Sequence, residues 1–174
     1  VINAAKSVKT HGATDYDIDV QAAGAVECRV NGPTKVVVTF DKAIQRVSGT
    51  NADVQLSSGS VSSLAVGGVG NTQLTVDMSG ATNGMPLTIG FTGIADAADI
   101  TKTCAGNVCF GVLTGDVNAS GGTDLFDLVT IRNVLNTAPT ASTFRSDVNA
   151  DGDINLFDLV TVRNNLNLSV GSCP

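Results

Sequence analysis

Two stretches of twelve residues concentrate side chains that carry oxygen donors. Residues 147–158 read DVNADGDINLFD, with four aspartates and two asparagines, and residues 116–127 read DVNASGGTDLFD. Hard divalent cations such as Ca²⁺ take about six to eight oxygen ligands, several of them anionic. Carboxylates held this close together repel one another unless a cation lies among them. The pattern favours two calcium sites over the alternative, a pair of solvated acidic turns that only cap helices.

The spacing within each stretch matches a twelve-residue calcium loop. Such a loop takes its ligands from positions 1, 3, 5, 7, 9 and 12 and has glycine at position 6, here Gly121 and Gly152. The predicted ligands are Asp116, Asn118, Ser120, the Gly122 carbonyl, Asp124 and Asp127 in the first loop, and Asp147, Asn149, Asp151, the Asp153 carbonyl, Asn155 and Asp158 in the second. Ser120 stands where the second loop has Asp151, so we expect the first loop to bind its ion more weakly. Ile154, at position 8, is expected to pair with its counterpart in the first loop and to pack inward.

Each loop leads into a segment with helical periodicity. Residues 116–136 and 147–167 are identical at fifteen of twenty-one aligned positions, so the region is an internal duplication. Apolar residues recur at spacings of three and four, at 125, 128, 131 and 135 and at 156, 159, 162 and 166. This spacing predicts one apolar face on a short helix. Each repeat is therefore predicted to be an acidic loop followed by one helix, and two Ca²⁺ are the expected cofactors.

The preceding part of the chain has a different pattern. From residue 14 to about 113, short alternating runs such as YDIDV and TKVVVTF follow one another at roughly eight- to twelve-residue intervals, separated by Gly, Asn and Ser. This pattern predicts an antiparallel, Ig-like β-sandwich. We expect a mostly β protein with two domains, residues 1–113 and 114–174, joined stiffly because almost no linker separates them.

Composition and charge exclude several classes of function. The net charge is −6, and seven of the sixteen acidic residues lie in the two loops, so the acidity is local. No basic patch with interleaved aromatics indicates nucleic-acid binding, and no apolar run is long enough to span a membrane. The chain has one histidine and no nucleophile elbow or phosphate loop, so we expect no enzyme. The start at Val1 without a signal-like segment leads us to expect a mature, processed form.

Four cysteines without a CxxC pair indicate two disulfides rather than a zinc site, and three connectivities are possible. Cys104 and Cys109 flank a short stretch that would suit a hairpin loop. We therefore favour the pairs Cys104–Cys109 and Cys28–Cys173. Disulfides indicate an oxidising, extracellular location.

The repeat pair at about 116–168 resembles the dockerin family. In that family two calcium loop-helix units, each lacking the entering helix of an ordinary EF-hand, are joined by a short connector, and position 12 is Asp, as it is here. The resemblance implies calcium binding and docking onto cohesin domains, which are β-sandwiches. Near-symmetric repeats imply that two binding orientations are available.

Loop positions 10 and 11 depart from the familiar pattern of cellulosomal dockerins. Those dockerins often carry a Ser/Thr pair for recognition, whereas this chain has Leu125-Phe126 and Leu156-Phe157. The departure suggests a more apolar contact with the partner, and the alternative is that both Phe side chains fill the core between the repeats. Arg132 and Arg163 occupy matching helix positions, where they either contact a partner or remain solvated.

Residues 8–100 resemble a β-sandwich module found beside dockerin-like repeats in predicted secreted proteins of environmental bacteria. KTHGATDYDIDV, VECRV and VVVTFDKAI carry this resemblance. His11, Glu27 and Arg29 are its distinctive polar residues, and a buried ion pair or a strand-edge hydrogen bond explains them better than catalysis.

These features lead to two hypotheses of function. In the first, the chain is an extracellular calcium-binding structural protein whose dockerin-like half docks onto the sandwich of the next copy and so forms a surface fibre or layer. The segment VINAAKSV would then also be able to add as a strand to a neighbouring sandwich. In the alternative, the chain is a dockerin-bearing module of a secreted, polysaccharide-degrading assembly with a cohesin-like partner.

Overall fold

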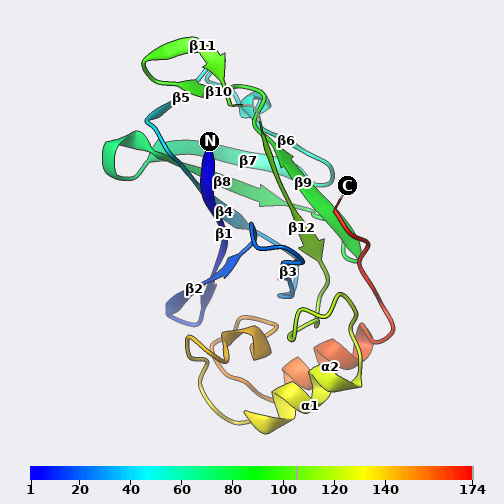
Figure 1. Cartoon of the computed structure of the whole chain (residues 1–174). Coiled ribbons are helices and arrows are strands. Elements are labelled where there is room, and N and C mark those ends of the chain that lie inside the picture. Colours follow the sequence, from blue (N-terminus) through cyan, green and yellow to red (C-terminus); the bar gives the residue numbers. More distant parts are fainter. Residues whose placement is uncertain (105, 174) are drawn as a thin grey trace.

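The computed structural model describes residues 1–104 and 106–173, which form a β-rich body followed by two helices (Figure 1). The strands are β1 (Ile2–His11), β2 (Thr14–Asp19), β3 (Val26–Glu27), β4 (Lys35–Phe40), β5 (Ile44–Arg46), β6 (Gln55–Leu56), β7 (Ser60–Gly67), β8 (Gln73–Ser79), β9 (Met85–Gly90), β10 (Ile94–Asp96), β11 (Asp99–Thr103) and β12 (Asn107–Val112). The helices are α1 (Leu125–Asn133) and α2 (Leu156–Asn164), and short 3₁₀ turns cover Asn51–Asp53, Val69–Asn71 and Phe144–Ser146. The predicted fold class, a β-sandwich followed by a small helical pair, is confirmed.

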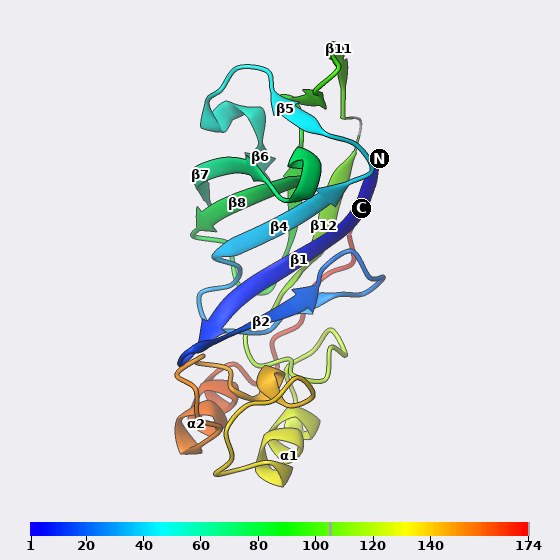
Figure 2. The same cartoon turned by 90° about the vertical axis from the view of Figure 1, so that its left-hand side faces the viewer.

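Two larger sheets form the sandwich, with strand orders β2-β1-β4-β8-β7 and β3-β12-β9-β6. A small sheet, β11-β10-β5, extends the end of the molecule that is far from the helices (Figures 1 and 2). Among the strands described, β3 pairs with β12 in parallel and the other ladders are antiparallel. The expectation of a purely antiparallel sandwich was therefore wrong at this ladder. The reason is that the chain crosses from β2 in one sheet to β3 in the other and enters beside β12 in the same direction.

One apolar core lies between the two larger sheets. Alternating residues of β4 and β9 point into it, with Val36, Val38, Leu87 and Ile89 fully buried. The intervening residues of these strands are more exposed, which is the two-residue period expected of strands with one buried face. Burial of these β-branched and leucine side chains supplies the main driving force for the sandwich.

Strand β1 lies within the predicted sandwich domain, residues 1–113, but the strand pattern was recognised only from residue 14 onward. It lies between β2 and β4 and is hydrogen-bonded to both, so both of its edges pair within its own sheet. The suggestion that this segment adds to a neighbouring sandwich is therefore not supported. The inward-facing positions of β1 include Ser7 and His11, both buried. Because these two side chains are polar, the hydrophobic alternation that would have identified the strand is hidden.

Both helices lie at one end of the molecule, beyond the hairpin of β1 and β2 (Figure 2). A second, smaller core joins them and consists of Val117, Ile131, Val148, Ile154 and Val162. Val30 of the sandwich packs against this core, and its N–H donates to the Val148 carbonyl at 2.9 Å. The Gly115 N–H donates to the Cys28 carbonyl at 2.9 Å. Backbone hydrogen bonds and shared packing therefore hold the two parts together directly.

The predicted disulfides are wrong. The structure joins Cys109 to Cys173, whereas Cys28 and Cys104 are free thiols. After α2 the tail returns along β12, where the Val170 side chain packs over Gly111, and this path brings Cys173 beside Cys109. Cys28 is buried at the junction instead, and burial raises the pKa of its thiol to about 11.

Neither α-helix in the described ranges is long and apolar enough to cross a membrane, since each has nine residues.

Candidate calcium-binding and docking site

The carboxylates at position 1 organise both loops. Asp116 is buried and accepts the N–H groups of Ser120 and Gly121, at 2.9 and 2.8 Å. Asp147 is equally buried and accepts the corresponding N–H groups of Asp151 and Gly152, at 3.2 and 3.0 Å. Each loop therefore wraps its backbone around one carboxylate in the same way.

The carboxylates at position 12 tie each loop to the helix that follows it. Asp127 is buried and accepts the N–H groups of Asn118 and Asp124, at 3.2 and 2.9 Å. In the second repeat, the buried Asp158 accepts the N–H groups of Asn149 and Asn155, at 3.1 and 2.9 Å. The same two aspartates stand in the first helical turns and complete capping boxes there.

The side chains at position 9 cap the helices. Asp124 accepts the Phe126 N–H at 2.7 Å, and Asn155 accepts the Phe157 N–H at 2.8 Å. The capping alternative is thus realised in the structure. It does not compete with cation binding, because each cap uses one side-chain oxygen lone pair and leaves others available.

Burial makes the loops unfavourable without a counter-charge. Burial raises the pKa of Asp127 and of Asp158. The backbone N–H groups whose hydrogen bonds they accept lower the pKa, but the negative charge of the position-1 aspartate in the same loop raises it further. A cation among these oxygens would offset the cost of desolvation and of like-charge repulsion.

The chemistry of the donors suits a hard ion. No group of three His, Cys, Asp or Glu side chains that could hold a metal by themselves is found in residues 1–104 and 106–173. The predicted sets depend in addition on Asn, Ser and backbone carbonyl oxygens. Such all-oxygen sets fit Ca²⁺ and do not fit zinc. All twelve predicted ligand residues lie within these two loops, and their role in binding stays a prediction.

The two loops do not pair with each other as expected. Ile154 does pack inward and is fully buried, but it forms a β-bridge with Thr137, after α1. In the first loop, the Thr123 N–H donates to the Leu168 carbonyl, after α2, at 2.9 Å. Each loop thus pairs with the segment that follows the other helix, which makes the two repeats interlocked and nearly symmetric.

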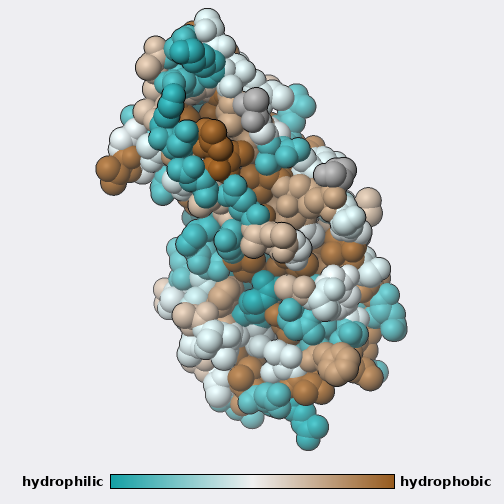
Figure 3. Space-filling view, in the orientation of Figure 1, coloured by the Kyte–Doolittle hydropathy of each residue, from teal (hydrophilic) through white to brown (hydrophobic). Residues whose placement is uncertain are grey.

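Loop positions 10 and 11 are exposed. Among the apolar residues with large exposed fractions are Leu125 (69%), Phe126 (72%), Leu156 (66%) and Phe157 (69%). The alternative in which both Phe side chains fill the core between the repeats was therefore wrong. The reason is that Ile131 and Val162 already occupy the interior face of the helices. Figure 3 shows apolar residues on the surface at the end of the molecule where the helices lie.

A shallow hollow runs between the exposed faces of α1 and α2. Its volume is about 530 Å³, and its lining is apolar apart from two arginines. The lining residues are Leu125, Leu128, Val129, Arg132, Leu156, Leu159, Val160 and Arg163. The structure thus brings four of the six predicted partner-contact residues to one hollow, while Phe126 and Phe157 are exposed on the same helices without lining it.

Sequence reasoning missed four lining residues, Leu128, Val129, Leu159 and Val160. In each helix a valine follows the first leucine by four residues and an arginine follows it by seven. These three residues therefore lie on one face of their helix, as Leu125, Val129 and Arg132 in α1 and as Leu156, Val160 and Arg163 in α2. This spacing occurs in both repeats and is the signal in the sequence that could have identified Val129 and Val160.

The three distinctive polar residues of the sandwich lie at its junction with the second loop. Glu27 and Arg29 form a fully buried ion pair, with Arg29 Nη2 2.6 Å from Glu27 Oε2 and Nε 2.7 Å from Oε1. Of the two explanations offered from the sequence, the buried ion pair is therefore the one found for Glu27 and Arg29. His11 lies beside this pair and contacts the loop itself.

Comparison with known proteins agrees with this arrangement in one region. Residues 114–167 match the family model described as the dockerin type I domain. No curated protein and no solved structure matches the chain. A dockerin domain is non-catalytic, binds calcium and docks onto a cohesin-type protein, and such domains occur in secreted proteins. The C-terminal part of this chain, which follows a β-sandwich, is thus similar to dockerin type I domains.

Proposed function

We propose that this chain is a non-catalytic, extracellular assembly protein whose C-terminal half folds around two calcium ions and docks onto a β-sandwich. The observation that carries the proposal is the exposed apolar face shared by α1 and α2. We call this face the docking face and define it as Leu125, Val129, Arg132, Leu156, Val160 and Arg163, together with Phe126 and Phe157.

The docking face has the composition of a protein contact. Leucine and valine side chains occupy its centre, and Arg132 and Arg163 lie in the last turns of their helices. Contiguous apolar surface bordered by charge is typical of protein–protein interfaces. Because the two helices present the same residues at matching positions, a partner is able to meet the face in two orientations related by the internal symmetry.

Calcium has a structural role in this proposal. The position-12 aspartates are both predicted ligands and members of the capping boxes that start α1 and α2. A bound ion would therefore fix the starts of both helices, where Leu125, Phe126, Leu156 and Phe157 lie. Docking should consequently require calcium, because the ions stabilise the fold of the helices that carry the docking face.

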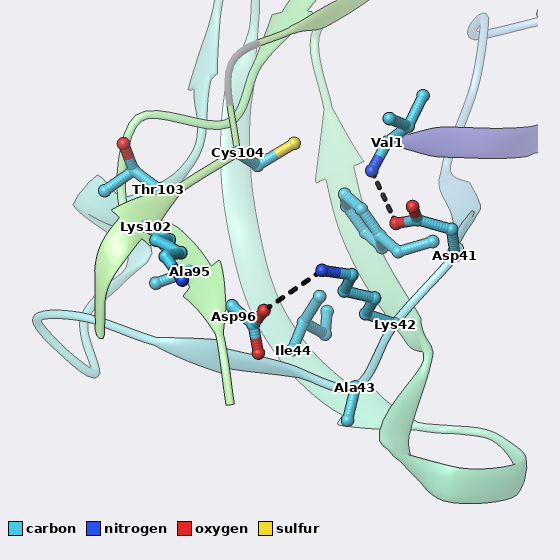
Figure 4. Close-up of a pocket in the computed structure, with 11 residues that line it drawn as sticks. Val1, Asp41, Lys42, Ala43, Ile44, Ala95, Asp96, Lys102, Thr103 and Cys104 are labelled. Carbon is cyan, nitrogen blue, oxygen red and sulfur yellow. Dashed lines mark hydrogen bonds and ion pairs between the residues drawn. The ribbon is translucent and has the colours of Figure 1, made fainter. Parts of the chain in front are cut away.

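A second candidate is that the receiving β-sandwich belongs to the next copy of the chain. One observation favours it: an apolar hollow of about 320 Å³ lies at the end of the molecule opposite the helices (Figures 1 and 4). Phe40, Ile44, Ala95 and Cys104 contribute to its lining, and ion pairs Val1–Asp41 and Lys42–Asp96 border it. Docking of one end onto the opposite end of the next copy is a heterologous contact, which propagates into a fibre unless it closes into a ring.

The test compares the molar mass of the purified chain in millimolar calcium and in EDTA, alone and mixed with a type I cohesin domain. Both helices must be altered together, because each of them contributes matching residues to the docking face. Leu125→Asp with Leu156→Asp suits this purpose, since both positions are the first of their helices, where a negative charge is tolerated. Val69→Asp is the matched control, because Val69 is 97% exposed and lies in the turn between β7 and β8 of the sandwich.

We expect a calcium-dependent complex that the double substitution abolishes and the control leaves intact. A complex with cohesin supports the separate partner, and growth of the chain alone supports docking onto the next copy. Monomers in every mixture, or complexes that persist in the double variant, would contradict the proposed docking face.

A further inference from the structure

His11 connects the sandwich to the second loop. It is the last residue of β1, and its Nδ1 atom lies 2.9 Å from Asp147 Oδ2, with both side chains fully buried. Asp147 is the predicted position-1 ligand of that loop. A side chain 136 residues earlier in the sequence therefore contacts a ligand that the loop itself supplies.

The hydrogen bonds around His11 fix which nitrogen carries the proton. Arg29 Nη1 lies 3.3 Å from His11 Nε2, and a guanidinium is only a donor, so Nε2 accepts and Nδ1–H donates to Asp147. Arg29 is itself held by Glu27 and by the carbonyls of Ser7 and Tyr16. A series of hydrogen bonds thus runs from Glu27 through Arg29 and His11 to Asp147. The sandwich residues determine which group donates and which accepts at each step.

The surroundings also fix the orientation of the imidazole. The rings of Tyr16 and Phe144 meet it edge-on at centroid distances of 5.2 and 5.9 Å, and these two rings stack on each other at 5.1 Å. The imidazole plane therefore has little freedom to turn away from Asp147.

The contact divides the two oxygens of Asp147 between different tasks. Oδ2 accepts from both His11 and the Gly152 N–H, so its two lone pairs are occupied. Among the described residues, Oδ1 accepts only from the Asp151 N–H, at 3.2 Å, and keeps a lone pair for a cation. His11 thereby holds the carboxylate in the orientation in which Oδ1 is presented to the loop.

The first loop has no equivalent contact within the described residues. The Asp116 carboxylate accepts from the Ser120 N–H and hydroxyl and from the Gly121 N–H, all within its own loop. The contact from outside goes to the Asp116 backbone carbonyl, from Arg145 Nη2 at 2.9 Å. The two loops therefore differ in what orients their position-1 ligand.

We propose that His11 is a positioning residue for calcium in the second loop, so that this loop depends on the sandwich for its affinity while the first loop does not. The inference rests on the proposed calcium-binding role of the loops. Partners that orient a metal ligand through a hydrogen bond change metal affinity by about 10- to 100-fold when they are removed. By linkage, calcium in the second loop should stabilise the β1–β2 hairpin by the same free energy.

The experiment titrates calcium into the full chain by calorimetry, one loop at a time. Asp116→Ala leaves only the second loop intact, and Asp158→Ala leaves only the first. In each background His11 is replaced by Leu, Asn or Gln. Leu has no hydrogen-bond donor. The Nδ2 of Asn is able to take the place of Nδ1 as the donor to Asp147, whereas the amide of the longer Gln side chain is not. Leu64→Ala is the control for general loosening, because Leu64 is a core residue of the sandwich.

We expect His11→Leu and His11→Gln to weaken the second loop by about tenfold or more and His11→Asn to restore most of the affinity. The calcium affinity of the first loop should change less than twofold in all three His11 variants. Leu64→Ala should leave the calcium affinities of both loops unchanged. Equal affinity in all His11 variants, or the same loss with Leu64→Ala, would overturn the inference. Absence of calcium binding in the chain without substitutions would instead overturn the proposed function.

Discussion

Gly12 and Gly152 meet backbone to backbone where the β1–β2 hairpin touches the second loop. A Cβ atom built on Gly152 would lie 2.9 Å from the Gly12 Cα, and one built on Gly12 would lie 3.2 Å from the Gly152 Cα. Both residues have positive φ, +61° and +99°, and the Gly12 N–H points to the Ala150 carbonyl at 3.4 Å. The sandwich and the loop thus approach each other as closely as glycine permits.

Gly152→Ala should destabilise the chain more than the same change in the first loop. Gly121 has φ +86° and occupies the matching turn position, but a Cβ there meets nothing within 4 Å. Gly121→Ala therefore measures the cost of positive φ alone, about 1 kcal/mol. We expect Gly152→Ala to cost about 1–3 kcal/mol more, because the backbone of the hairpin must move. Equal losses in denaturant unfolding would show that the two backbones are not in contact.

The buried Glu27–Arg29 pair predicts a pH dependence of stability. Burial raises the pKa of Glu27, but the hydrogen bonds and charge of Arg29 outweigh this and hold it below the ordinary value of 4.5. A depressed folded-state pKa gives stability that is present above the unfolded pKa and is lost as the pH falls through the folded pKa. Glu27→Gln should therefore cost about 3 kcal/mol at neutral pH, because it leaves Arg29 buried without its counter-charge.

The cost of Glu27→Gln should shrink as the pH falls below about 4, because unfolding of the wild type then takes up a proton on Glu27, and it should vanish once the pH is below the depressed folded-state pKa. Urea unfolding of both proteins in EDTA, at a series of pH values, measures this difference without calcium binding. A cost that stays constant down to about pH 3 would contradict the ion pair as the source of the effect.

The structure predicts a thiol count that distinguishes one disulfide from the two expected from the sequence. Unfolding without reductant should release two titratable thiols per chain, those of Cys28 and Cys104. In the folded chain Cys28 should not react, because burial raises its pKa to about 11. The bridge closes a loop with a sequence separation of 64, so Cys173→Ser should cost about 4 kcal/mol in the chain-entropy account. Detection of no free thiol after unfolding would contradict the free state of Cys28 and Cys104.

The two acidic loops and the helices that follow them were predictable because their determinants are local. Within each repeat, 116–136 and 147–167, the spacing of the oxygen-bearing side chains, the turn glycine and the helical period all lie within twenty-one residues, so the sequence contains the evidence directly. The helix faces were only partly predictable. Periodicity placed Leu125 and Ile131 on one apolar face, but Leu125 is exposed and Ile131 is buried, because a helix of nine residues next to a small core buries only one stripe.

The junction was not predictable because its determinants are distant in sequence. His11 and Asp147, and Cys109 and Cys173, are brought together by the path of the whole chain. The partner of Ile154 depended likewise on how the repeats interlock. The same contacts also couple the two parts of the chain. Removal of calcium should loosen the β1–β2 hairpin along with the helices, instead of melting the C-terminal half alone.

The number of calcium ions bound per chain tests the central claim most directly. Calorimetric titration of the EDTA-stripped chain should show two ions, with the second loop the tighter because Asp151 and His11 are available only there. A chain that keeps both helices by circular dichroism yet binds no calcium would contradict the account.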